Sequence, residues 1–359
     1  MTKEYNNEKI NSLEYMILVI FSSRSLYNGI GIQNMLNFSK IDTWMSILLG
    51  FIIGFIPLFV VMYLNKKKIN LFELIKSKII KFIFMIFLVF TFITLLNDFT
   101  NFASLQYLFE TPNLVIALLV IIPSLYIVNK GIETIGRASL FMFYISFILF
   151  LVNSISLFQY IEIDNLKPLL KDGIMPVLYS SLHFVSYSIA PILFLSIIPK
   201  SDENYKTYNK KLILGYIISS LSIFIIIFYV TTVFNYQYTS LFNYPVYFIL
   251  KKIEYEFLSN VENVFSLFFV IDYFFTILIY MYSIKYYLKN ELHLKNKIFN
   301  IVYIIITCII IYIAVFVYKD INVVHIVSND LLFYILSAFI VLFIIVVPIL
   351  LRKIDVNES

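Results

Sequence analysis

Long apolar runs separated by short polar segments extend over almost the whole chain. A helix needs roughly 20 predominantly apolar residues to cross the hydrocarbon core of a bilayer, and ten runs reach or approach that length. No polar segment between them is long enough for a water-soluble domain, so residues 1–359 are expected to form a single transmembrane domain. The ten predicted spans are 13–38, 43–64, 82–107, 113–129, 134–158, 174–198, 211–234, 262–287, 298–318 and 329–351.

Two of these spans contain residues that disfavour a continuous helix. The first has Gly29 and Gly31 near its centre, and the sixth has Pro191 after two serines. Glycine and serine lower helix propensity, and proline removes a backbone donor. Breaks at positions one and six of ten predict two five-helix halves, about 13–158 and 174–351, as in inverted-repeat transporters that bind solute between broken helices. The alternative is a seam of small residues that lets helices pack closely.

The distribution of Lys and Arg favours a cytoplasmic position for both termini. With the N-terminus inside, 20 of the 27 basic residues lie on the cytoplasmic side, six lie outside, and Arg24 lies within the membrane. Because cytoplasmic loops are enriched in basic residues, the count supports both this orientation and the number of spans. The polar start of the chain, which contains acidic residues, does not match a cleavable signal peptide.

Composition agrees with a membrane protein and argues against several other classes. The chain is 61% hydrophobic and 14% charged, whereas a soluble domain carries roughly 25% charged residues. The net charge of +5 is divided among short clusters, so no basic surface for nucleic acid is expected. The one cysteine, Cys308, excludes a disulfide framework and a cysteine metal site. Without a P-loop, an HExxH motif or a nucleophile elbow, we predict no enzyme, no catalytic residue, no cofactor and no metal.

Polar and ionisable side chains inside the spans are the candidates for a functional site. A charge at the bilayer centre costs at least about 2.5–3.5 kcal/mol, so such residues are functional candidates by default. Asp98, His183 and Asp272 are predicted to share one layer slightly outside the midplane, and Arg24 lies about one turn deeper. The predicted substrate-binding residues are Ser22, Ser23, Arg24, Asn28, Gly29, Gly31, Asn97, Asp98, His183, Ser186, Tyr187 and Asp272.

The chemistry of these residues suits a zwitterionic amino acid. The guanidinium of Arg24 offers a planar fork of donors to a carboxylate, and a half-helix N-terminus adds partial positive charge. The ligand ammonium would face Asp98, Asp272 or exposed carbonyls of the sixth span. We predict that Arg24 pairs with Asp98, which lies on a polar stripe of the third span, and that Asp272 is the proton carrier beside His183. An Arg24–carboxylate pair that only holds helices together remains an alternative.

Six segments of the chain resemble one known family in their order and spacing. They are DTWMSILLGFIIGFIP at 42–57, YLFETPNLVI at 107–116, KGIETIGRAS at 130–139, NLKPLLKDGIMPVLYSS at 165–181, IIP at 197–199, and the stretch from FNYP to VENVF at 242–265. Together they resemble the spore germination permeases, the membrane B subunits of nutrient germinant receptors. That family belongs to the amino acid/polyamine/organocation transporters.

The resemblance implies an all-α, ten-helix inverted-repeat fold of the leucine-transporter type, with helices 1 and 6 broken. It also implies a permease-like subunit in the inner membrane of a spore or in a cell membrane, which binds an amino acid or similar nutrient near mid-membrane. Its expected partners are an A-type and a lipoprotein C-type subunit. The first helix departs from the plainer one of relatives by carrying Arg24. Two alternatives remain open: secondary active amino acid transport coupled to H⁺ or Na⁺, and an assembly subunit whose pocket is vestigial.

Overall fold

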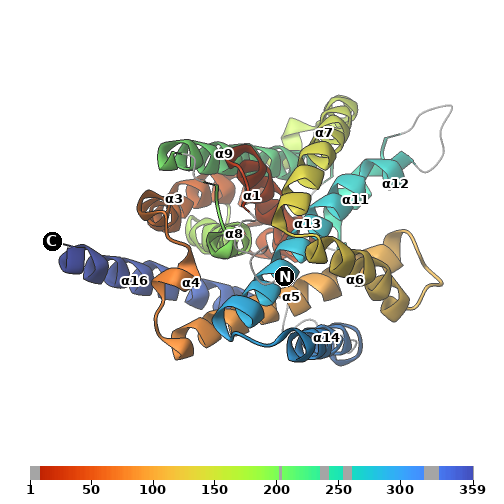
Figure 1. Cartoon of the computed structure of the whole chain (residues 1–359). Coiled ribbons are helices and arrows are strands. Elements are labelled where there is room, and N and C mark those ends of the chain that lie inside the picture. Colours follow the sequence, from red (N-terminus) through yellow and green to blue (C-terminus); the bar gives the residue numbers. More distant parts are fainter. Residues whose placement is uncertain (1–8, 202–203, 235–241, 254–260, 319–330, 359) are drawn as a thin grey trace.

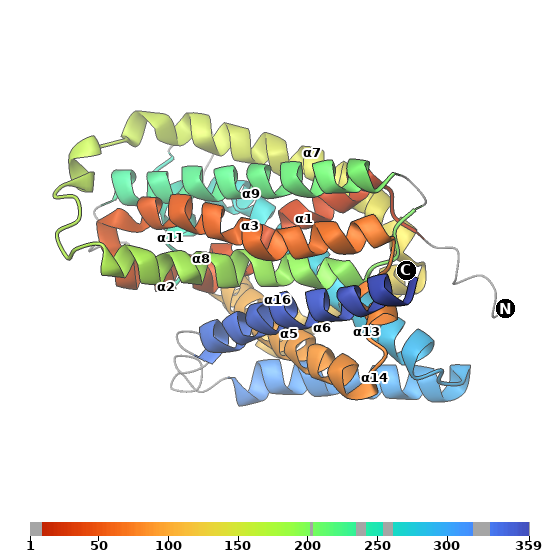
Figure 2. The same cartoon turned by 90° about the vertical axis from the view of Figure 1, so that its left-hand side faces the viewer.

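The computed structural model describes residues 9–201, 204–234, 242–253, 261–318 and 331–358. Long helices run side by side in a bundle, roughly along one direction (Figure 2). Eight helical stretches of the described residues are long and apolar enough to cross a membrane. The predicted all-helical, multi-pass membrane fold is therefore confirmed.

The helices follow one another along the chain with short connections. The first half contains α1 Ser12–Leu26, the π-helical turn η2 Tyr27–Gly31, α2 Ile32–Ser39, the 3₁₀ turn η3 Lys40–Asp42, α3 Thr43–Lys67, α4 Leu71–Leu74, α5 Lys78–Gln106, α6 Asn113–Asn129, α7 Ile132–Leu157 and the 3₁₀ turns η4 Phe158–Tyr160 and η5 Ile163–Leu166. The second half contains α8 Met175–Phe194, η6 Leu195–Ile197, α9 Tyr205–Val233, α11 Pro245–Leu250, α12 Val261–Phe265, α13 Leu267–Tyr286, the π turn η7 Tyr287–Glu291, α14 Asn296–Tyr312, the π turn η8 Ile313–Val317 and α16 Leu332–Glu358.

Within the described residues, each predicted span coincides with helix; residues 329 and 330 of the last span lie outside them. The first two spans lie in one 56-residue helical stretch, Ser12–Lys67, which is divided at Lys40, where φ is 49°. At this turn the chain reverses, so that α3 runs back along the bundle (Figure 2). Helix α6 has 17 residues, which is shorter than the roughly 20 that a perpendicular crossing needs. Ten membrane crossings therefore stay a prediction.

The sixth predicted span is not broken. Helix α8 runs without interruption from Met175 to Phe194, with Pro191 inside it, so the predicted break at 183–191 is wrong. A proline removes one backbone donor, and neighbouring helices make this tolerable within a membrane bundle. All α8 residues from His183 to Phe194 are buried, because the helix packs against α1, α2, α3 and α16. This packing outweighs the low helix propensity of the serines.

The first predicted span contains a π-helical turn where a break was expected. The Ile32 N–H donates to the Tyr27 carbonyl across η2, so the backbone stays wound and hydrogen-bonded instead of opening. The predicted unwinding of helix 1 over 22–31 is therefore wrong as well. A π turn inserts one extra residue into the helix, and such turns are frequent at functional sites. The irregularity is real, but its form is a widened turn.

The centre of the bundle is formed by α1 and α8 and the helices around them. Helix α1 packs against α7, α8, α9 and α13, and α8 also contacts α3 and α16. Viewed along the bundle, α8 lies near the middle, while α7 and α14 lie toward opposite edges (Figure 1). The start of α1 and the end of α16 are at the same end of the bundle (Figure 2). This arrangement puts the polar centre of α1 in the protein interior, away from lipid.

Candidate functional site

Arg24 and Asp272 form a buried ion pair between α1 and α13. The Arg24 Nη2 atom is 2.6 Å from Asp272 Oδ1, and the two side chains are 5% and 0% exposed. Arg24 Nη2 also donates to Ser146 Oγ of α7 at 3.1 Å. The Asn28 amide donates to the second carboxylate oxygen of Asp272 at 3.1 Å. One carboxylate thus connects α13 to α1 and η2, and the guanidinium extends the connection to α7.

The predicted pairing of Arg24 with Asp98 is wrong. The Asp98 carboxylate accepts hydrogen bonds from the hydroxyls of Tyr273 and Tyr244, at 2.5 and 3.1 Å, and from the backbone N–H of Ile30. The packing of the helices explains why Arg24 meets Asp272 and not Asp98. Helix α13, which carries Asp272, packs along α1, whereas α5, which carries Asp98, contacts η2. Asp98 therefore meets the π turn just beyond Arg24 and is held by neutral donors.

Gly29 lets Asp98 approach the backbone of η2. A Cβ atom at Gly29 would lie 1.9 Å from Asp98 Oδ2 and 2.3 Å from the Tyr273 hydroxyl, which is too close for any side chain. A Cβ at Gly31 would have its nearest contact at 3.3 Å and would lie 3.4 Å from Tyr187 Cβ. The two glycines thus allow η2 to sit against α5 on one side and near α8 on the other.

Several buried polar atoms near η2 have no hydrogen-bond partner among the described residues. They are Ser22 Oγ, Arg24 Nε, Tyr27 Oη and Asn28 Oδ1. Buried polar groups are normally hydrogen-bonded, and leaving one unsatisfied costs about 1–3 kcal/mol. These atoms include a cationic donor, an amide acceptor and two hydroxyls within seven residues of chain. They can serve a small molecule that carries both charged and polar groups.

The predicted residues of α8 contact the first helix through side chains. The Ser23 and Ser188 hydroxyls are 2.5 Å apart and share a hydrogen bond. The Tyr187 hydroxyl accepts a hydrogen bond from the Asn34 amide of α2 at 2.8 Å. Ser186 is 2% exposed. Helices α1 and α8 therefore meet through a polar contact between two of the predicted site residues.

His183 lies apart from the ion pair, in a cluster of aromatic rings. Its imidazole stacks on Phe333 with ring centroids 3.9 Å apart and is edge-on to Tyr179 at 4.9 Å. Neither ring nitrogen has a hydrogen-bond partner in the described part of the chain. The predicted pairing of His183 with Asp272 is wrong, because His183 packs against Phe333 of α16, whereas Asp272 pairs with Arg24 of α1.

Asn97 supports a different element from the one that carries Arg24. Its amide donates to the Ala314 carbonyl of η8 at 2.7 Å. Asn101 donates to the Asn97 oxygen at 3.1 Å, and Asn113 donates to Asn101 at 3.0 Å. Asn97 and Asn101 of the predicted polar stripe thus belong to a chain of amides that connects α6, α5 and η8. A role of Asn97 in binding stays a prediction.

Two site residues were not found from the sequence, and a third was assigned to packing. Tyr273 follows Asp272 directly, and a tyrosine in an aromatic-rich chain gives no pattern that marks it. Tyr244 comes from the connection before α11, so only the tertiary fold brings it to Asp98. Ser146 lies seven residues from both Ser139 and Asn153 in the fifth predicted span, a spacing that indicates helix packing and does not by itself mark a binding site. Among the described residues, no three His, Cys, Asp or Glu side chains cluster as metal ligands would.

Comparison with known proteins gives consistent matches. The profile of the family described as "Spore germination protein" matches residues 9–324. "Spore germination protein KB" of Bacillus subtilis (strain 168) is 26% identical over 258 residues, which are 67% of this chain and 68% of the relative. "Putative spore germination protein YfkT" of the same organism is 28% identical over 228 residues, which are 61% and 62% of the two chains. The crystal structure of a mutant Eremococcus coleocola manganese transporter aligns with a TM-score of 0.48 and 13% identity, over 93% of this chain and 75% of that one.

Proposed function

Because the chain belongs to the spore germination protein family, we propose that it is a permease-like receptor subunit that binds an amino acid or a similar small nutrient near mid-membrane. The observation that carries the proposal is the buried Arg24–Asp272 pair beside the π turn, near polar atoms that have no hydrogen-bond partner within the described part of the chain. A buried ion pair is a poor source of stability, because desolvation of both charges offsets their attraction. A role in binding gives a reason for keeping the pair.

A zwitterionic ligand can replace Asp272 as the partner of Arg24 and, at the same time, replace Arg24 as the partner of Asp272. Its carboxylate would accept from Arg24 and its ammonium would donate to Asp272, so neither protein charge would be left uncompensated. Arg24 Nε and Asn28 Oδ1 supply a further donor and a further acceptor within the same group. A ligand with only one charge would leave Arg24 or Asp272 buried and unpaired, which is costly. The proposed specificity is therefore for molecules that carry both charges close together.

We also propose the five-plus-five inverted repeat for the fold. The contacts of each helix in the first half match the contacts of its counterpart in the second half. Helix α1 packs on α9 as α8 packs on α3, and α1 packs on α7 as α8 packs on α16. Likewise α13 packs on α7 as α5 packs on α16. This correspondence supports a two-fold relation between the halves, with ten crossings.

We further propose that both termini are cytoplasmic and that A-type and C-type receptor subunits are the partners. The excess of basic residues on one side supports the orientation. The start of α1 and the end of α16 lie at the same end of the bundle (Figure 2), which supports one side of the membrane for both. The proposed location is the inner membrane of a spore or a cell membrane. Family membership supports a permease and not an enzyme.

Secondary amino acid transport coupled to H⁺ or Na⁺ is the second candidate. It is favoured by the two buried carboxylates, Asp98 and Asp272, one on each side of the π turn. Uptake of a labelled amino acid into proteoliposomes that contain this chain alone would support transport. Binding without uptake would favour the receptor subunit.

The test of nutrient binding is a ligand panel on the purified protein. Thermal unfolding should shift upward with a zwitterionic amino acid and not with the corresponding amine or acid alone. Arg24→Gln should abolish this shift while the variant remains folded by circular dichroism. Arg137→Gln is the matched control, because Arg137 is 76% exposed on α7. If Arg24→Gln is folded and binds as the unaltered chain does, the proposed site is wrong.

A further inference from the structure

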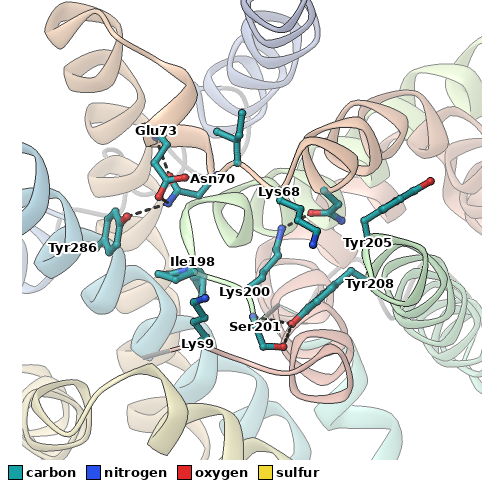
Figure 3. Close-up of a pocket in the computed structure, with 13 residues that line it drawn as sticks. Lys9, Lys68, Asn70, Glu73, Ile198, Lys200, Ser201, Tyr205, Tyr208 and Tyr286 are labelled. Carbon is teal, nitrogen blue, oxygen red and sulfur yellow. Dashed lines mark hydrogen bonds between the residues drawn. The ribbon is translucent and has the colours of Figure 1, made fainter. Parts of the chain in front are cut away.

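A second site is suggested by a cavity at the end of the bundle where α1 begins. The cavity has a volume of about 400 Å³. Its walls come from the segment before α1, the end of α3, the α4 region, the segment after α8, the first turns of α9 and the end of α13 (Figure 3). Arg24 and Asp272 do not line it. A ligand here would be distinct from one at the ion pair.

The described lining of this cavity has more positive than negative charge. Lys9, Lys68 and Lys200 line it, and Glu73 is the acidic side chain among the lining residues. Both oxygens of the Glu73 carboxylate accept hydrogen bonds from Asn70, one from the amide at 2.6 Å and one from the backbone N–H at 3.2 Å. The carboxylate is thus engaged in capping α4.

Lys200 is partly buried in this wall, and its described contacts are neutral. Its ammonium donates to the Asn65 side-chain oxygen and lies 4.7 Å from the centre of the Tyr15 ring. Burial lowers the pKa of Lys200 to about 7. A depressed lysine pKa means that the surroundings do not compensate the positive charge. An anion in the cavity would supply that compensation.

Further donors surround the lysines. Tyr205 is the first residue of α9 and one of the residues that line the cavity. The N-terminus of this 29-residue helix brings partial positive charge to the same wall. Tyr286 contributes a second hydroxyl from α13, which is hydrogen-bonded to Asn70 at 3.0 Å. Ammonium groups, hydroxyls and a helix N-terminus together match the requirements of a phosphate oxygen.

We propose that this cavity binds a phosphate group. The group belongs either to an anionic lipid head group of the adjoining leaflet or to a small phosphate-bearing solute. Lysine binds phosphate as a compact point charge, and Lys68 and Lys200, whose described contacts include no carboxylate, line a space of suitable size. The inference does not depend on the proposed nutrient site, because none of its lining residues takes part in that site.

The test uses the full chain in two settings. In neutral detergent without added lipid, the protein is titrated with inorganic phosphate and its thermal unfolding is followed. In parallel, it is placed in nanodiscs with and without phosphatidylglycerol. Ligand that binds the native state raises the unfolding temperature. A shift with inorganic phosphate identifies a solute site, whereas a shift only with phosphatidylglycerol identifies a lipid head-group site. Either result supports the proposal.

Two variants within the lysine run 66–68 distinguish loss of a charge in the cavity from loss of a charge outside it. Lys68→Gln removes a cavity charge, and Lys66→Gln removes an equal charge that does not line the cavity. Lys68→Gln should weaken phosphate or lipid binding by at least about tenfold, the equivalent of about 1.4 kcal/mol. Lys66→Gln should leave binding unchanged. Lys200→Met serves as a second cavity variant. If neither phosphate source shifts unfolding, or if Lys66→Gln and Lys68→Gln weaken binding equally, the proposal is wrong.

Discussion

The guanidinium of Arg24 lies 2.6 Å from the carboxylate of Asp272, with both side chains almost completely buried. The two residues are 248 positions apart in the sequence, and the contact joins the first helix to α13. Asp98, the other intramembrane aspartate, is held by tyrosine hydroxyls and a backbone N–H. The two carboxylates therefore have different partners and should respond differently to mutation.

Breaking the Arg24–Asp272 pair should cost stability. Arg24→Met leaves Asp272 buried with only the Asn28 donor, and loss of one partner of a buried pair costs about 3–5 kcal/mol. The double variant Arg24→Met/Asp272→Leu should recover most of that loss, because no isolated charge remains. Reversible unfolding in mixed micelles would measure each change. Equal instability of the single and double variants would contradict the expected coupling.

Asp98 should depend on its tyrosine donors. Tyr273→Phe removes a hydrogen bond to the carboxylate, and the free energy of unfolding should fall by about 1.5–3 kcal/mol. Tyr280→Phe is the control on the same helix, because the buried Tyr280 hydroxyl has no hydrogen-bond partner among the described residues. Its removal should be neutral or slightly stabilising. Similar losses in both variants would mean that ring packing, not the hydrogen bond, holds Asp98.

Gly29 should tolerate no side chain. Gly29→Ala places a methyl group 1.9 Å from Asp98 Oδ2, so either η2 or the carboxylate must move, at a cost of about 1–3 kcal/mol or more. Gly31→Ala has its nearest contact at 3.3 Å and should cost less. Thermal unfolding of the two variants compares them directly. Equal unfolding temperatures would show that η2 adjusts freely.

Stability should rise with pH between about 7 and 10 because of Lys200. Burial lowers the pKa of Lys200 from 10.5 to about 7, so across this window the unfolded chain binds a proton that the folded chain has lost. The free energy of unfolding then increases with pH. The other titratable groups that the structure describes around this wall are Tyr15 of α1, Tyr205 and Tyr208 of α9, Tyr286 of α13, Lys9, Lys68 and Glu73.

Lys200→Met should remove this part of the pH dependence. Unfolding temperatures at pH 7 and pH 9, in buffers without phosphate, should converge in the variant, and its value at pH 7 should exceed that of the unaltered chain. Lys66→Met, on the exposed end of α3, should keep the original slope. A slope that survives in Lys200→Met would assign it to another group.

The orientation can be checked by cysteine labelling after Cys308 is replaced by serine. A cysteine at Leu169, which is 50% exposed, should react with a membrane-impermeant maleimide from outside. A cysteine at the exposed Lys66 should react only after the membrane is opened. The reverse pattern would overturn the cytoplasmic assignment of both termini.

The sequence by itself determined the spans and the residues of greatest chemical interest. Apolar length is a local property, and a helix satisfies its own backbone, so the ten predicted spans coincide with helices. The cost of burying charge is also local, and it marked Arg24, Asp98 and Asp272. The glycines at 29 and 31 correctly indicated an irregular first helix.

Only the tertiary structure decided which of these residues meet. Depth along a helix follows from residue number, but the direction of a side chain depends on how each helix is rotated against its neighbours. For this reason Arg24 pairs with Asp272, while Asp98 reaches η2 and His183 packs against Phe333. The continuity of α8 through Pro191 was likewise decided by burial among four helices, which local propensity does not include. The lysine-lined cavity is formed by segments far apart in the chain, and charge becomes concentrated there only when the helices assemble.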